Sequence, residues 1–141
     1  MCALRGKNGA LKQGVIKGDD VIAIYHCSIK IISRGKGKSA VAAAAYRAGE
    51  KLYNNYDGIT HNFTRKGGIV HTDILLPANA PAEYADRSTL WNAVEAVEKS
   101  KNAQLAREIE IALPNELSQK ECIALTHDFV QKTFVEQYLW V

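Results

Sequence analysis

One segment of this 141-residue chain is more informative than any other: Ser39-Ala-Val-Ala-Ala-Ala-Ala-Tyr46-Arg47-Ala-Gly-Glu50-Lys51-Leu52-Tyr53. Alanine has the highest helix propensity and little bulk, so the run predicts a helix over about 40–53 with Ser39 as its N-cap. The small residues around Tyr46 leave room for another molecule to approach its phenol. Because the basic loop 34–38 precedes the helix, we expect this molecule to be anionic.

The composition indicates one ordinary globular domain. Hydrophobic residues make up 47% of the chain and charged residues 23%, which excludes an intrinsically disordered protein. The formal net charge of +3 is too small to indicate nucleic-acid binding by itself. The positive residues of the chain are clustered, however, and a local cluster is more informative about binding than the net charge.

The two ends of the chain and its cysteines give weaker signals. Residues 1–20 are rich in glycine and lysine without an apolar core, so they predict a flexible leader and not a secretory signal. No apolar run reaches the roughly 18 residues of a membrane span. Cys2, Cys27 and Cys122 have no metal-ligand spacing, which favours reduced thiols. We therefore expect a cytoplasmic protein.

Along the chain, segments with the two-residue hydrophobic period of a strand alternate with segments that have the 3.6-residue period of a helix. This pattern predicts strands over 21–32, 68–76 and 106–113. Helices are predicted over 40–53, over 88–99, and from the capping box Ser118-Gln-Lys-Glu121 onward. The first strand is apolar enough to be largely buried. The order β-α-β-α-β-α indicates an α+β fold or a compact α/β sandwich.

The basic loop suggests a phosphate site. A nucleotide-binding P-loop is excluded, because Ile32 stands where that pattern needs glycine. A helix N-terminus beside lysines still attracts phosphate through free N–H groups and the helix dipole. A solvated loop is an equally good interpretation. The residues predicted to contact DNA phosphates are Lys30, Arg34, Lys36, Lys38, Ser39 and Arg47.

Three further residues are candidates for chemistry. Tyr46 is a helical tyrosine, and most such residues belong to a core; an ordinary phenol, with a pKa of about 10, is a poor nucleophile unless cations or a base assist it. Glu108 and Glu110 share one strand face, where they could accept a proton or support a metal, although a solvated sheet face explains them as well. None of the four histidines has metal-ligand spacing.

Three separated motifs together resemble one family. They are Ala23-Ile-Tyr-His26, the segment 39–52, and Glu108-Ile-Glu110-Ile-Ala-Leu-Pro114. In this order they are similar to the MobA/MobL family of plasmid mobilisation relaxases, over about residues 21–137. The resemblance implies a palm-like antiparallel sheet flanked by helices. It also implies that a tyrosine nicks one DNA strand at an origin of transfer and becomes linked to the 5′ phosphate.

The resemblance assigns roles to particular residues. Tyr46 matches the family nucleophile, and Glu108 and Glu110 match an acidic pair near the metal centre, with Glu110 the better candidate for an active-site role. The implied cofactor is a divalent metal, Mg or Mn, held by histidines. The implied partners are single-stranded DNA at the origin of transfer and accessory relaxosome proteins.

The chain departs from the family pattern in two places. Residues 1–20 lie outside the resemblance, and the apolar end Tyr138-Leu-Trp-Val141 stands where a loop and strand leading to the histidine motif are expected. We therefore expect an incomplete palm, no complete metal site, and a fragment that nicks DNA poorly by itself. The alternatives are a DNA-binding remnant without catalysis and a pseudogene product without a stable fold.

Overall fold

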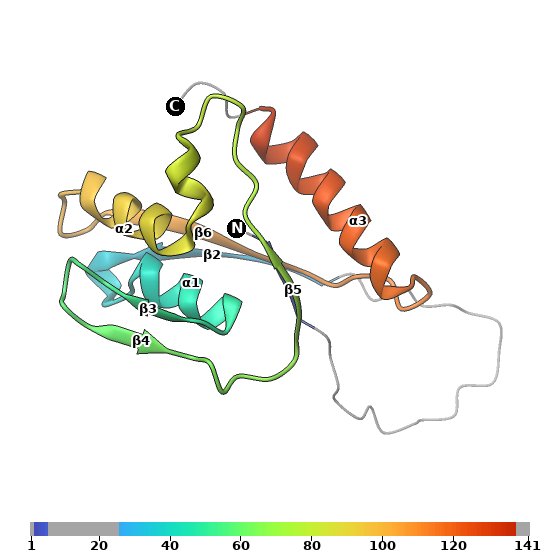
Figure 1. The fold of residues 1–141 in the computed structure, drawn as a ribbon, viewed down its shortest axis with the longest axis horizontal. Helices are drawn as coiled ribbons and strands as arrows, with labels where there is room; N and C mark the ends of the chain where they lie inside the picture. The colour runs from blue at the N-terminus through green and yellow to red at the C-terminus, as the bar shows by residue number, and fades with distance from the viewer. Residues whose placement is uncertain (1, 6–25, 138–141) are drawn as a thin grey trace.

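A computed structural model describes residues 2–5 and 26–137. Strands and helices are mixed along the chain, as Figure 1 shows. The strands are β1 (Cys2–Arg5), β2 (Cys27–Ser33), β3 (Lys51–Tyr53), β4 (Thr60–Asn62), β5 (Ile69–Asp73) and β6 (Gln104–Ile111). The α-helices are α1 (Ala40–Ala48), α2 (Arg87–Val97) and α3 (Gln119–Val130). Two 3-10 turns, Arg34–Lys36 and Ala82–Ala85, and a π-helical turn, Gln131–Val135, complete the described elements.

The strands pair into three antiparallel ladders, β1 with β5, β2 with β6, and β3 with β4. The predicted α+β class is therefore confirmed, with antiparallel pairing as expected. The pairing is divided among small ladders, and the hairpin β3–β4 was not predicted. The longest ladder joins β2 to β6 and places Lys30 opposite Glu108 and Ser28 opposite Glu110.

The predicted helix over 40–53 ends five residues early, at Ala48. Gly49 adopts a left-handed conformation with φ 68°, and its backbone N–H bonds to the carbonyl of Ala45, which closes the helix. A Cβ at this position would lie 2.5 Å from Cδ1 of Ile69, the mobile end of a side chain, so glycine is favoured here by its conformation. The chain then turns into β3. Because α1 ends at Ala48, Tyr46 lies in the last turn of the helix.

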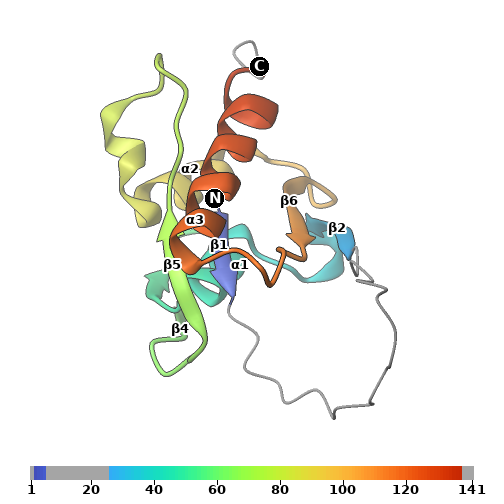
Figure 2. The same ribbon diagram turned by 90° about the vertical axis from the view of Figure 1, so that its right-hand side faces the viewer.

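The prediction that the first strand is largely buried is wrong for its described part. Ile29 is 64% exposed and Ile31 41%, and only Ile32 is buried. Successive strand residues face opposite sides, and α1 and α2 lie on one side of the β2–β6 ladder (Figure 2). The exposed isoleucines lie on the other side. The first five residues of the predicted strand, 21–25, lie outside the described residues.

Two small clusters form the core around α1. One contains Ile32, Ala40, Ala103 and Leu105, and the other contains Val41, Ala44, Ala45 and Leu52. Trp91 of α2 packs against both clusters and so joins them. Ala40, Ala44 and Ala45 of α1 thus face the core, while Tyr46 on the same helix is exposed.

The two ends of the chain differ from expectation in part. Residues 2–5 of the predicted flexible leader form β1 and pair with β5, while 6–20 and the atypical end 138–141 lie outside the described residues. The capping box that begins α3 is present, with the Ser118 hydroxyl and the Glu121 carboxylate each bonded to the other's backbone N–H. Leu125 and Phe129 of α3 remain exposed. Among the described residues, no helix is both long and apolar enough to cross a membrane.

Candidate active site

Tyr46 lies in the last turn of α1 and is 41% exposed. Two residues of the β4–β5 connection contact its ring. Nζ of Lys66 lies 3.5 Å from the ring centroid, and the Phe63 ring meets it edge to face at a centroid distance of 5.3 Å. The expectation of an accessible phenol therefore agrees with the geometry, although the catalytic role itself stays a prediction.

Arg47 follows Tyr46 and reaches from α1 to β6. Its Nε lies 3.0 Å from Oε2 of Glu108, its Nη2 bonds the second carboxylate oxygen, and Glu110 lies 3.8 Å away. The hydrogen bonds from Arg47 hold the pKa of Glu108 below its ordinary value. The same contacts raise the pKa of Arg47. Its guanidinium carbon is 5.8 Å from the Tyr46 ring centroid, so the phenol and both carboxylates share one cation.

The glutamates do not lie on a plainly solvated face. Glu108 contacts Arg47 of α1 and has Lys30 at 4.0 Å, whereas Ile109 and Ile111 on the opposite face are 37% and 46% exposed. The alternative interpretation, a solvated carboxylate face behind a buried isoleucine row, is therefore wrong for the isoleucines and for Glu108. Arg47 of α1 thus partly covers Glu108, whose side chain is 21% exposed, whereas the side chain of Glu110 is 45% exposed.

The other end of α1 is already occupied. Oε1 of Glu95 accepts a hydrogen bond of 2.7 Å from the backbone N–H of Ala40, the first residue of the helix. Glu95 also pairs with Arg34 at 3.0 Å, and their side chains are 2% and 9% exposed. A buried carboxylate thus takes the position predicted for a phosphate. The predicted anion site at the start of α1 is wrong for this reason.

Arg34 and Ser39 consequently have structural roles. Arg34 donates to the backbone carbonyls of Glu95 and Ser100 as well as to the Glu95 carboxylate, and its guanidinium stacks on Tyr56 at 4.1 Å. The Ser39 hydroxyl accepts from the backbone of Ala42, as a predicted N-cap should. It also accepts from the amide of Asn54. These contacts give both side chains a structural role, and their predicted DNA contacts stay a prediction.

The structure therefore divides the predicted residues into two groups. Tyr46, Arg47, Glu108, Glu110 and Lys30 gather where α1 meets the β2–β6 ladder. Lys36 and Lys38 are exposed in and after the 3-10 turn, and Lys38 lies close enough to act electrostatically on Glu108. Their DNA contacts stay a prediction.

Sequence reasoning missed the residues that hold the site in place. Glu95 lies on α2, 61 positions from Arg34, and nothing in its pattern distinguishes it from the other acidic residues of that region. Phe63 and Lys66 fall in a segment with no clear periodicity. Only the turn signal Asn54-Asn55-Tyr56-Asp57-Gly58 between two short β-favouring runs could have revealed the hairpin that precedes them.

The described residues do not fit a metal centre by themselves. Within 2–5 and 26–137, no group of three or more histidines, cysteines, aspartates or glutamates is placed to hold a metal ion. Glu108 and Glu110 are already neutralised in part by Arg47. His127 instead lies beside Asp73, with 3.6 Å between Nε2 and the carboxylate. We therefore assign the described residues no step that depends on a metal.

The model of the MobA/MobL family matches residues 38–139 of the chain. This chain belongs to the MobA/MobL family. It is 49% identical over 104 residues to mobilization protein MobL of Acidithiobacillus ferridurans, a match that covers 74% of this chain and 27% of that protein. It is 46% identical over 121 residues to conjugal transfer protein TraA of Agrobacterium fabrum, which covers 79% of this chain and 11% of TraA. The chain thus spans a minor part of these MobA/MobL relatives.

The fold is also similar to that of a solved structure described as "Molecular Basis of Vancomycin Resistance Transfer in Staphylococcus aureus". The TM-score is 0.74 at 36% sequence identity, and the match covers 78% of this chain and 56% of the other. This likeness shows that the two chains share a fold over the matched part.

Proposed function

We propose that this chain forms the nucleophile-bearing part of a DNA relaxase that acts in plasmid mobilisation. Its expected substrate is one DNA strand at an origin of transfer, with accessory relaxosome proteins as expected partners. The observation that carries the proposal is the exposed phenol of Tyr46, held beside Arg47 and Lys66 at the end of α1. Relatives named mobilization and conjugal transfer proteins support the same role.

The proposed reaction is a transesterification. The phenolic oxygen of Tyr46 attacks the scissile phosphorus, a bond forms between them, and the bond from phosphorus to the 3′ oxygen breaks. The proton lost by the phenol ends on the departing oxygen, which becomes a free 3′ hydroxyl. The number of phosphate ester bonds is unchanged, so the covalent intermediate can later be rejoined without an energy source.

The surrounding charges suit this chemistry. A phosphate that approaches Tyr46 meets the cation of Arg47, whose guanidinium carbon lies 5.8 Å from the ring centroid. Fixed positive groups stabilise the charge that develops in a phosphoryl transition state. Glu108 and Glu110 hold Arg47 in place from β6. We assign these two glutamates the task of orienting Arg47 beside the ring.

The test is a covalent adduct. End-labelled single strands that tile the DNA on both sides of the coding sequence are incubated with the chain and Mg²⁺ or Mn²⁺. The expected product is a protein–DNA band that survives denaturation, together with an extendable 3′ hydroxyl. Tyr46→Phe should abolish this adduct, because phenylalanine has no oxygen to bond to phosphorus. The matched control is Tyr53→Phe, since Tyr53 is another exposed tyrosine of the same region.

A chimera separates the site from its context. The matched segment of Acidithiobacillus MobL is replaced by residues of this chain, and the adduct is measured again with and without EDTA. We expect a faster, metal-dependent adduct in the chimera than in the chain alone. Fast nicking by the isolated chain would contradict the expectation of poor activity. An adduct that persists in Tyr46→Phe, in either protein, would overturn the proposed function.

A second candidate is DNA binding without nicking. The observation that favours it is the exposure of Lys30, Lys36 and Lys38 on one stretch of chain. A complex that forms on the same strands but never becomes covalent, even in the chimera, would support this alternative. The two functions are therefore distinguished on a single gel.

A further inference from the structure

A single ammonium group contacts Tyr46 at two points. Nζ of Lys66 donates a hydrogen bond of 2.6 Å to the backbone carbonyl of Tyr46 and lies 3.5 Å from the centroid of its ring. A cation at this distance over an aromatic face is attracted by the ring quadrupole. One side chain therefore fixes both the main chain and the ring of the same residue.

The end of α1 explains why a lysine is found there. The backbone N–H groups of Gly49 and Glu50 both donate to the carbonyl of Ala45. The carbonyl of Tyr46 therefore lacks the N–H partner that a continuing helix would supply from Glu50. It also lies at the negative end of the helix dipole, which favours a cation. The ammonium group of Lys66 donates to this carbonyl and places a positive charge at the end of the helix, so its position follows from how the helix ends.

Phe63 holds the ring from a second direction. Its ring meets that of Tyr46 at an interplanar angle of 87° and a centroid distance of 5.3 Å, a favourable edge-to-face arrangement. A backbone hydrogen bond of 2.9 Å from Lys66 to Phe63 closes the turn that carries both side chains. The ring is thus contacted by two residues of one turn, while 41% of Tyr46 stays exposed.

We propose that Lys66 is a positioning residue that holds the phenol of Tyr46 in one orientation for attack on DNA. This inference deepens the proposed function and rests on it for its role in the reaction. An in-line displacement requires the attacking oxygen to be placed within a fraction of an ångström, and a misplacement of about 1 Å can cost on the order of 10²-fold in rate. Lys66 supplies that placement before the DNA arrives.

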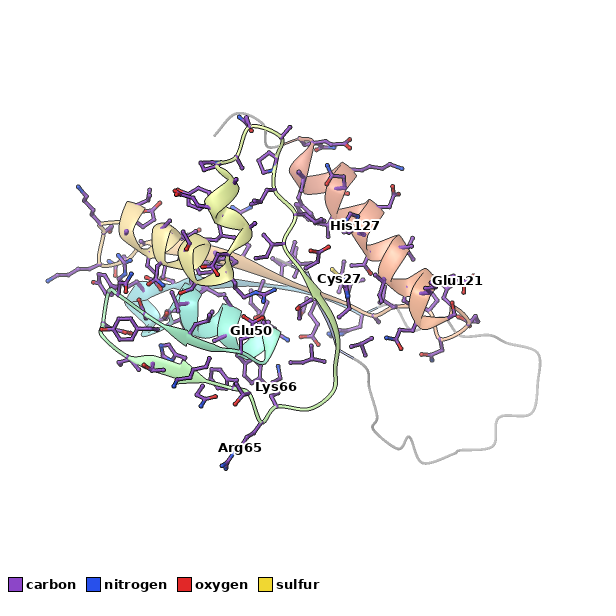
Figure 3. The ribbon with its side chains drawn as sticks, viewed as in Figure 1. Cys27, Glu50, Arg65, Lys66, Glu121 and His127 are labelled. Carbon is purple, nitrogen blue, oxygen red and sulfur yellow. The ribbon has the colours of Figure 1, made fainter. Side chains whose placement is uncertain are left out.

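Arg65 provides a matched control. It precedes Lys66 in the same turn and carries the same charge, but it is exposed and extends away from the fold, as Figure 3 shows. Lys66→Met and Arg65→Met remove the same charge from adjacent positions. A difference between them therefore reports the contacts of the Lys66 side chain and not the net charge of the loop, and the ring signals of Tyr46 identify which contact is lost.

The contact is tested by NMR on the full chain, without DNA. We expect the ε-methylene protons of Lys66 to be shifted upfield by the Tyr46 ring, with nuclear Overhauser effects between them, and Tyr46 to occupy one χ1 rotamer. Lys66→Met should average the χ1 couplings of Tyr46 while the amide shifts of residues 40–45 stay unchanged. Lys66→Arg should restore the single rotamer, and Arg65→Met should have no effect. Unshifted Lys66 protons, or a single rotamer in Lys66→Met, would overturn the proposal.

The kinetic test uses single-turnover adduct formation by the full chain. Lys66→Met should lower the rate constant at saturating DNA about tenfold or more and leave the half-saturating DNA concentration unchanged. A role in binding alone would give the reverse pattern and contradict the inference. If the unaltered chain forms no adduct, that result counts against the proposed function, and the NMR comparison still decides whether Lys66 positions the ring.

Discussion

The two ends of α1 hold their charged side chains in different ways. At the N-terminal end, Arg34 and Glu95 are 9% and 2% exposed, and Glu95 also accepts from the first N–H of the helix. At the C-terminal end, Arg47 and Glu108 are 24% and 21% exposed beside a half-open tyrosine. Each end has an arginine–glutamate pair, but the buried pair fastens the helix and the open pair leaves a phenol within reach of a ligand.

The largest expected effect is at the buried end. Glu95→Ala should lower the free energy of unfolding by about 3–5 kcal/mol, because it leaves the Arg34 charge and the Ala40 N–H buried without the carboxylate. Urea denaturation followed by circular dichroism measures the change. Such a loss approaches the whole stability of a small domain, which is about 5–15 kcal/mol.

Two variants make this measurement specific. Glu98→Ala removes an exposed carboxylate three positions further along and should change stability little. Arg34→Met combined with Glu95→Met removes both charges together and should recover part of the loss. Equal destabilisation by Glu95→Ala and Glu98→Ala would contradict the fastening role of the buried pair.

The contrast between the ends of α1 also separates what sequence can and cannot predict. The Ser39 cap, the alternation of β6 and the capping box at Ser118 depend on residues within a few positions of each other, so local pattern is sufficient to predict them. The predicted helix is too long because the alanine run masks the stop signal of Gly49, whose left-handed conformation ends α1.

Local sequence pattern cannot predict which residues pair when they are far apart in the sequence. Arg34 with Glu95 and Arg47 with Glu108 each join positions 61 apart. Lys30, Arg34 and Arg47 read alike as cations beside a helix, and only the packing of α2 and β6 against α1 decides which arginine is buried. The family resemblance found Tyr46, but the groups that hold its ring come from a turn with no periodicity.

A smaller effect is expected at the open end, and it should depend on pH. Arg47→Met removes the partner of Glu108 and should cost about 1–2 kcal/mol of unfolding free energy at pH 7. Since Arg47 lowers the folded-state pKa of Glu108, this stabilisation is fully present above the ordinary value of 4.5 and is lost as pH falls through the lowered pKa. The difference between unaltered chain and variant should therefore shrink below pH 4.5.

Denaturation at pH 7 and at about pH 3 tests this sign, with Glu108→Gln and the double variant completing the cycle. The coupling between Arg47 and Glu108 should be present at the higher pH and weaker at the lower one. A coupling that is independent of pH would mean that the ionised carboxylate is not what Arg47 stabilises. Because the pair is partly open, the effect should remain well below that of Glu95→Ala.

The smallest effect is expected for DNA affinity. It concerns the exposed lysines of the basic loop, which do not form buried or half-buried pairs like those of Arg34 and Arg47. Lys36→Ala and Lys38→Ala should each reduce the slope of log Kobs against log salt by about 0.7 on single-stranded DNA, because each variant neutralises one phosphate fewer. Filter binding over a range of roughly 50 to 200 mM salt measures the slope. Neither variant should change stability, since both side chains are exposed.

Lys120→Ala is the matched control, because Lys120 is also exposed but lies on α3, outside the basic loop. If it reduces the slope as much as Lys36→Ala, binding is a general response to positive charge and the loop has no special part in it. If only the loop variants act, DNA phosphates contact the basic loop that precedes α1. The N-terminal end of α1, which the buried Arg34–Glu95 pair holds in place, would then be a rigid support for the DNA bound at the loop.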